Sequence, residues 1–161
     1  MRTPDPTRRT LANRSAARAS AEQELIDREA VRAVMLNYAG GVDGRDLARV
    51  AALFVPGAVY EGTVGRGTIE VALASLRERL TRYERTMHLL PHQLVEIDGR
   101  AAQSETYGVA YHRVRGEAAS LVVGVRYVDR LTRGEEGWRI AHRLVSLEWR
   151  RYEVGPWPAC G

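Results

Sequence analysis

The sequence contains a single cysteine, Cys160, and no lysine, so all 24 of its basic residues are arginines. One cysteine excludes an intramolecular disulfide and a cysteine-based zinc site. No segment approaches the roughly 18 uninterrupted apolar residues that a membrane-spanning helix needs. These absences predict a protein of a reducing compartment, which we take to be the cytoplasm, with no membrane among its partners.

The charge is uneven along the chain. Five arginines fall in the first 22 residues against Asp5 and Glu22, so the remainder is near neutral although the formal net charge is +4. Nucleic-acid binding requires a basic face on the folded domain, which a near-neutral body does not supply. The length of 161 residues and the hydrophobic share of 45% fit one domain. We expect a disordered basic tail over residues 1–21 and one domain over residues 22–161, with a C-terminal tail from about residue 151.

Apolar residues recur at three- and four-residue spacing in the first half of the chain, which is the period of an amphipathic helix. The spacing predicts helices over residues 22–38 and 68–82, and a short helix between them that Asp46 caps and that runs through Phe54. A short strand over residues 58–61 precedes the third helix. The first half is therefore expected to be mainly helical.

The second half is typical of β-strands. Four segments rich in β-branched and aromatic residues, separated by glycine-containing turns, predict long strands over residues 86–97, 101–115, 120–132 and 138–150. Helices followed by a strand meander indicate an α+β domain in which a curved antiparallel sheet wraps over the helices.

Two of these strands predict a pocket, because alternate residues of a strand share a face. One face of the second strand carries mostly small residues and ends in a histidine: Ser104, Thr106, Gly108, Ala110 and His112. One face of the third strand is mostly apolar: Leu121, Val123, Val125, Tyr127, Asp129 and Leu131. Small side chains beside an apolar face leave the space that a small-molecule site requires.

Several residues could carry chemistry, and each also has an ordinary structural interpretation. Asp43 is either a turn or cap residue or a buried carboxylate. His88 and His112 are either structural residues or proton carriers, because imidazole titrates near neutral pH. His92 follows a proline, and His142 lies in an arginine-rich strand, so both are weaker candidates.

Other kinds of site lack their motifs. The histidines at positions 88, 92 and 112 have no helical partner at i+4 and no short metal-ligand pattern around them, so no metal site is predicted. A hydrolase nucleophile elbow and a complete dinucleotide-binding loop are also absent from the sequence. Neither a metal nor a cofactor is expected.

Four segments together resemble a known family. Residues 37–47, 85–89, 127–131 and 137–140 are similar, in this order, to the SnoaL-like branch of the nuclear-transport-factor-2-like superfamily, and within it to scytalone dehydratase and hexachlorocyclohexane dehydrochlorinase. The resemblance runs from about residue 22 to residue 150. It implies a cone-shaped fold, with three helices packed in a strongly curved mixed or antiparallel sheet around a cavity.

The resemblance also implies the roles of individual residues. Asp43 and His88 stand at the positions of the catalytic aspartate and histidine of those enzymes, and His112 matches a second histidine of scytalone dehydratase. For the proton-transfer mechanism that these matches imply, Tyr38, Tyr60 and Tyr127 are candidate substrate-binding residues that donate to a developing enolate. His112 is the candidate proton donor to a departing hydroxyl group.

The chain departs from scytalone dehydratase at several substrate-binding positions. Val125 and Tyr127 replace a serine and an asparagine, and Val42 replaces a tyrosine. Gly62 replaces a second tyrosine. These departures imply similar chemistry on a more apolar substrate.

The resemblance supports two functions. The first is a cofactor-independent dehydratase, cyclase or isomerase of secondary metabolism, in which a histidine–aspartate dyad acts on a small, largely apolar carbonyl compound of polyketide type. The alternative is a non-catalytic ligand-binding or assembly subunit, such as the small subunit of a ring-hydroxylating dioxygenase. Exposed aromatic residues on the long strands, including Tyr107, Tyr111 and Trp149, favour a homo-oligomer in either case, and the family makes it a dimer or trimer.

Overall fold

The computed structural model describes the backbone of residues 6–155 and the side chains of residues 17–155. Cys160 and most of the expected C-terminal tail lie outside the described residues. The elements, in chain order, are α1 (Pro6–Asp43), α2 (Leu47–Ala52), β1 (Phe54–Gly62), β2 (Gly65–Thr68), α3 (Ile69–Leu80), β3 (Tyr83–Asp98), β4 (Ala101–Val114), β5 (Ala119–Gly134) and β6 (Gly137–Val154).

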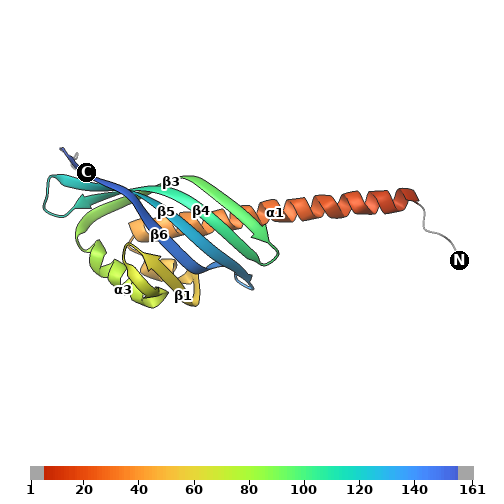
Figure 1. The fold of residues 1–161 in the computed structure, drawn as a ribbon, viewed down its shortest axis with the longest axis horizontal. Coiled ribbons are helices and arrows are strands. Elements are labelled where there is room, and N and C mark those ends of the chain that lie inside the picture. The colour runs from red at the N-terminus through yellow and green to blue at the C-terminus, as the bar shows by residue number, and fades with distance from the viewer. Residues whose placement is uncertain (1–5, 156–161) are drawn as a thin grey trace.

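The strands form one six-stranded mixed sheet in the order β2-β1-β6-β5-β4-β3. All neighbours are antiparallel except β1 and β6, which are parallel. The long strands curl together, α1 packs against β3, and α3 packs against β1 and β2 (Figure 1). This arrangement confirms the expected α+β fold, in which a strongly curved sheet surrounds the helices.

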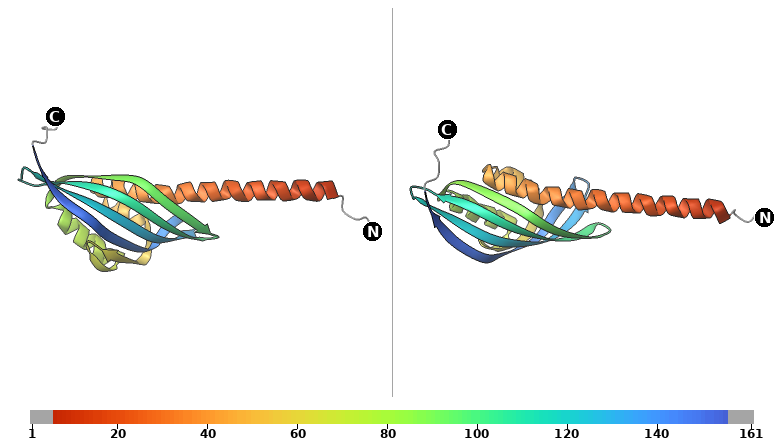
Figure 2. Two further views of the ribbon diagram at one scale, coloured as in Figure 1. Left: turned by 45° about the horizontal axis from the view of Figure 1, so that its top comes forward. Right: turned by 90° about the horizontal axis from the view of Figure 1, so that it is seen from above.

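The first helix is much longer than expected. It begins at Pro6, so residues 6–21, which we expected to be a disordered tail, are helical. The first half of α1 projects beyond the sheet in every view (Figure 2), and residues 17–26 are exposed. Alanine and arginine have high helix propensity, and extending an existing helix costs far less free energy than starting one. The docked second half of α1 can therefore support the exposed residues 17–21 without packing against the sheet.

The same helix also ends later than expected, at Asp43 instead of near residue 38. The glycines in its last turns allow a close approach to α2, since a Cβ on Gly41 would lie 2.7 Å from Val50 Cγ2. Asp46 caps α2 as predicted, accepting a hydrogen bond of 2.9 Å from the backbone N–H of Arg49. Phe54, expected in this helix, is instead the first residue of β1, where it is buried.

The four long strands are confirmed, with bounds that differ by a few residues, and β6 includes residues 151–154 of the expected tail. The edge strand β2 was missed because two of the four residues in its sequence, Gly-Arg-Gly-Thr, are glycines, which are depleted in strands. β1 starts before the expected residues 58–61. A register shift between Phe54 and Val59, with Gly57 at a φ of 70°, accommodates a proline–glycine pair that ordinarily ends an element.

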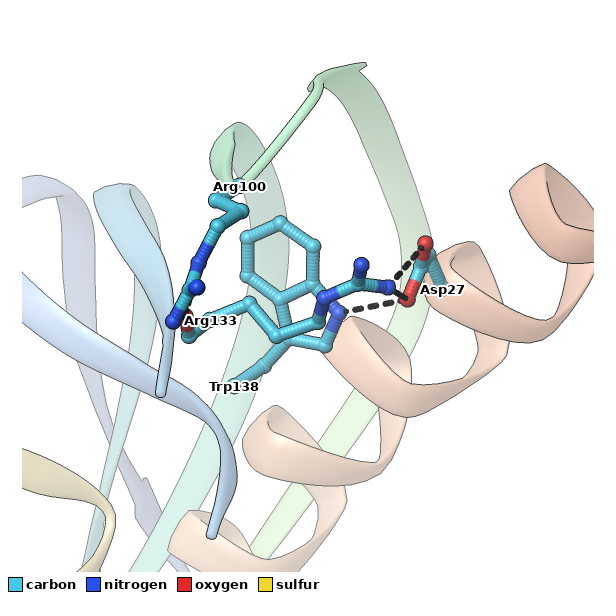
Figure 3. A network of polar contacts seen from close by, with 4 residues as sticks. All are labelled: Asp27, Arg100, Arg133 and Trp138. Atoms are coloured by element: carbon cyan, nitrogen blue, oxygen red, sulfur yellow. Dashed lines mark hydrogen bonds and ion pairs between the residues drawn. The ribbon is translucent and has the colours of Figure 1, made fainter. Parts of the chain in front are cut away.

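A buried carboxylate fastens α1 to the far end of the sheet (Figure 3). Asp27 accepts hydrogen bonds from Arg133 Nη1 at 2.7 and 2.8 Å and from Trp138 Nε1 at 3.0 Å. Arg100 in turn donates to the carbonyl oxygen of Arg133. The hydrogen bond from Trp138 and the charge and hydrogen bond of Arg133 lower the pKa of Asp27 despite its burial. These contacts join α1 to the β5–β6 hairpin and fix the helix over the sheet.

None of the helices within the described range is long and apolar enough to cross a membrane.

Candidate functional site

A cavity of about 590 Å³ lies inside the curved sheet. Its walls come from α1, β1, the β1–β2 turn, α3 and the inner faces of β3–β6, and its lining residues are Tyr38, Val42, Tyr60, Gly62, Thr63, Val64, Leu76, Arg79, Leu80, Tyr83, His88, Ala110, His112, Leu121, Val123, Val125, Tyr127, Val145, Leu147 and Arg150. This volume suits a small-molecule ligand. Every expected site residue except Asp43 lines the cavity, and Asp43 lies directly behind His88.

The small-residue face of β4 contributes less open space than expected. Ala110 and His112 line the cavity. Gly108, by contrast, is packed, since a Cβ there would lie 3.1 Å from Leu90 and 3.3 Å from Tyr127. Thr106 is buried outside the cavity lining. The pocket prediction is correct for one end of this strand, and the other end is solid core.

Asp43 and His88 form a close pair at the cavity wall. Asp43 Oδ1 lies 2.7 Å from His88 Nδ1, and Asp43 Oδ2 accepts a 2.8 Å hydrogen bond from the backbone N–H of His88. Thr86 Oγ1 donates to Asp43 Oδ1 at 2.8 Å. Thr86 and His88 share one face of β3 because they are two residues apart, and Asp43 reaches them from the end of α1. Asp43 and His88 are 45 residues apart in the sequence.

The electrostatics of the pair favour a charged carboxylate. Burial raises the pKa of Asp43, but the hydrogen bonds from His88 and Thr86 and the charge of His88 outweigh it, so the net pKa lies below the ordinary value of 3.8. An ionised Asp43 accepts the Nδ1 proton of His88 and so fixes the tautomer. In a neutral imidazole whose proton lies on Nδ1, Nε2 carries a lone pair, and His88 lines the cavity. The arrangement can take up a proton from a bound molecule.

His112 differs from the proton donor that we expected. Burial and the charge of nearby His88 lower the pKa of His112 to about 4. Its ring lies 6.0 Å from the ring of His88, and its Nδ1 lies 3.3 Å from the carbonyl oxygen of Leu121. A neutral imidazole that donates through Nδ1 has a lone pair at Nε2, so His112 is suited to accept a hydrogen bond from a substrate and not to protonate a leaving group near pH 7.

This depressed pKa predicts how stability depends on pH. Between about pH 6.5 and 4 the unfolded chain protonates at His112 while the folded protein does not, so stability is complete above this window and falls as the pH is lowered through it. Between pH 7 and pH 5, protonation linked to His112 is expected to lower the free energy of unfolding by about 1 to 2 kcal/mol. Urea unfolding at the two pH values should show a smaller loss for His112→Gln than for the native protein. Equal losses would contradict the depressed pKa.

A buried ion pair that the sequence analysis missed supports the floor of the site. Arg143, fully buried, donates to Asp129 through Nε and Nη2, both at 2.7 Å. Its guanidinium lies 4.1 Å from the ring centre of Tyr38 and 5.1 Å from that of Tyr127. Burial alone would lower the pKa of Arg143, but Asp129 outweighs it and the net shift is upward. The sequence did contain a signal for this pair: Asp129 lies on an otherwise apolar strand face, and a charge that faces the core requires a partner of opposite charge.

The three tyrosines of the cavity keep their phenolic protons. Burial raises the pKa of Tyr60 to about 12, and it also raises the pKa values of Tyr38 and Tyr127. Each phenol is therefore available as a hydrogen-bond donor over the whole physiological pH range.

The remaining histidines lie apart from the dyad. His92 is exposed on β3, and His142 Nε2 lies 3.3 Å from Glu61. Within the described residues, no three histidine, cysteine or acidic side chains gather into a metal-binding group. Histidines 88, 92 and 112 therefore do not converge.

Several solved structures share this fold. A protein named as a scytalone dehydratase, from Novosphingobium aromaticivorans, is 19% identical, with a TM-score of 0.76 over 84% of this chain and 93% of that chain. LinA is 16% identical, with a TM-score of 0.79 over 88% of this chain and 99% of that chain. A third, named as an aromatic ring hydroxylase from N. aromaticivorans, is 21% identical, with a TM-score of 0.67 over 81% and 94%. At these identities the likeness shows the fold alone.

No curated protein matches the chain. The family model described as a SnoaL-like domain matches residues 23–144, which is most of the chain and includes Asp43, His88 and His112. The structural likeness and this match agree with the resemblance seen in the sequence motifs. The chain belongs to the SnoaL-like domain family.

Proposed function

We propose that the protein is a cofactor-independent enzyme that moves a proton on a small carbonyl compound with a largely apolar body. The observation that carries this proposal is the contact of 2.7 Å between Asp43 Oδ1 and His88 Nδ1 at the wall of a cavity. A base oriented by a carboxylate is the minimum equipment for proton abstraction without a metal.

In the proposed reaction, His88 Nε2 takes a proton from the carbon next to the carbonyl group. Asp43 holds the imidazole in the required tautomer and stabilises the imidazolium that forms. The electron pair of the broken C–H bond moves into an enolate. His88 then returns the proton, either to a departing hydroxyl group or to another carbon. Elimination, ring closure and isomerisation all share this first step.

The enolate requires donors in a site with little water. Tyr38, Tyr60 and Tyr127 line the cavity and remain protonated, so any of them can donate to a developing negative charge. Val125 and its apolar neighbours hold the body of the substrate by contact alone. His112 Nε2 accepts a hydrogen bond from a substrate hydroxyl.

The alternative function is a non-catalytic ligand-binding or assembly subunit, because one fold supports many functions. Proteins with different names share this fold, among them one named as an aromatic ring hydroxylase. The closed contact between Asp43 and His88 favours the enzyme, since a scaffold has no use for an oriented base. Self-association as a dimer or trimer remains a prediction for either function, and Tyr107 and Trp149 on the outer face are 42% and 44% exposed.

The test is proton exchange in D₂O, followed by ¹H NMR with a panel of ketones and β-hydroxyketones. The native protein is expected to accelerate the loss of the signal from the α-carbon protons or to produce the eliminated product. Asp43→Asn is expected to slow this by about 10² to 10⁴-fold. Asp98→Asn, at the exposed last residue of β3, is the matched control and should retain the full rate. No acceleration with any member, or full activity in Asp43→Asn, would contradict the proposal.

A further inference from the structure

Two arginines line the cavity that holds the dyad. Arg79 comes from the last turn of α3 and Arg150 from β6, so they belong to different walls of the same cavity. The lining includes no aspartate or glutamate. Within the described residues, neither arginine forms an ion pair or a side-chain hydrogen bond, whereas neighbouring Arg151 pairs with Glu153 at 2.6 Å. The cavity therefore has unopposed positive charge beside walls that are mainly apolar.

The strand register places this charge at a definite distance from the dyad. His88, Ala110, Val123 and Arg150 are successive partners across β3, β4, β5 and β6, and all four line the cavity. Neighbouring strands lie about 4.8 Å apart, so the backbone positions of His88 and Arg150 are separated by about 14 Å along the sheet. Ala110 and Val123 form an apolar floor between them.

We propose that the cavity selects an elongated apolar molecule with a carboxylate at the end remote from the reacting carbon, and that Arg79 and Arg150 hold this carboxylate. This inference rests on the proposed function only for the identity of the reacting end. A planar guanidinium matches the two oxygens of a carboxylate, and the cavity lining supplies no carboxylate of its own. The apolar floor holds the body of the molecule, and His88 acts at its other end.

An alternative interpretation is that two exposed arginines are ordinary in a chain with 24 basic residues. The chain offers close controls for this alternative. Arg77 lies on α3 two residues before Arg79, is exposed, and does not line the cavity. Arg151 follows Arg150 directly but is absent from the cavity lining and has its own acidic partner. A general effect of positive charge would be the same for both pairs of arginines.

The experiment uses 1-naphthaleneacetate and 1-naphthaleneacetamide, which have nearly the same shape and differ in charge. Isothermal titration calorimetry of the full chain at pH 7 and low ionic strength is expected to give about tenfold tighter binding for the carboxylate. The double variant Arg79→Gln/Arg150→Gln should bind both probes with the weaker affinity of the amide. The control variant Arg77→Gln/Arg151→Gln should keep the preference.

Three outcomes would overturn the inference: equal binding of the two probes by the native protein, a preference that survives in Arg79→Gln/Arg150→Gln, or no binding of either probe. Tighter binding of 1-naphthyl phosphate than of the carboxylate would overturn the choice of carboxylate. His88→Ala separates this inference from the proposed function. A carboxylate preference that persists in His88→Ala would show that the anion site does not depend on the dyad. A native protein that prefers the carboxylate but catalyses no proton exchange would keep the anion site and contradict the proposed enzyme.

Discussion

His88→Ala is expected to reduce proton exchange on a responsive carbonyl substrate by about 10² to 10⁴-fold, because a positioned general base contributes a factor of this size. Of the two dyad residues, His88 lines the cavity and Asp43 does not. A water molecule in place of the imidazole would be a far weaker base. NMR of the exchange reaction at pH 7 measures the rate. Circular dichroism should show that the fold is retained.

The matched control is His92→Ala on the same strand. His92 is exposed, whereas the side chain of His88 is 9% exposed and hydrogen-bonded to Asp43. The control should keep the native rate. The melting temperature of His88→Ala should fall by no more than a few degrees, since Asp43 keeps its hydrogen bonds from Thr86 and from the backbone N–H of residue 88. A folded His88→Ala protein that exchanges protons at the native rate would show that His88 is not the base.

Asp129→Ala is expected to lower the free energy of unfolding by about 3 to 5 kcal/mol. The substitution removes the anionic partner of Arg143, whose side chain is fully buried, and leaves an uncompensated charge among Tyr38, Phe54 and Tyr127. Restoring water to this guanidinium would require opening the core. Urea unfolding of the variant and the native protein measures the difference.

Two further variants test this explanation. Asp129→Ala/Arg143→Met removes both charges and is expected to recover a large part of the lost stability, because a buried apolar side chain costs no desolvation. Glu105→Ala removes a carboxylate 3.8 Å from Arg126 in a partly exposed pair, and should cost far less than Asp129→Ala. A double variant no more stable than Asp129→Ala would show that the loss comes from packing and not from the unpaired charge.

Much of the fold could be predicted because the long strands carry a clear period of two. The alternation in β4 and β5 correctly assigned His112 and Val125 to the inner face. The same reasoning overestimated the space beside Gly108, because periodicity identifies a face and does not show what packs against it. Leu90 and Tyr127 fill the space there.

The pairing of Asp43 with His88 depended on the family resemblance. Local propensity favoured a turn or cap role for Asp43, and the residue in fact ends α1. Asp43 and His88 are 45 residues apart in the sequence, and no local sequence pattern predicts a contact over that separation. Arg143 was missed for a related reason: in a strand rich in arginine, its burial follows only from its position opposite Asp129. Long-range pairing decides both cases.

The parallel contact between β1 and β6 also has a consequence for how the chain acquires its structure. Tyr60 and Arg143 are register partners, and β2, α3 and three long strands separate them in the sequence. β1 therefore cannot pair with β6, its neighbour toward the centre of the sheet, until β6 has been synthesised. Closing so long a loop makes folding slow, and the interior can form only after β6 has left the ribosome.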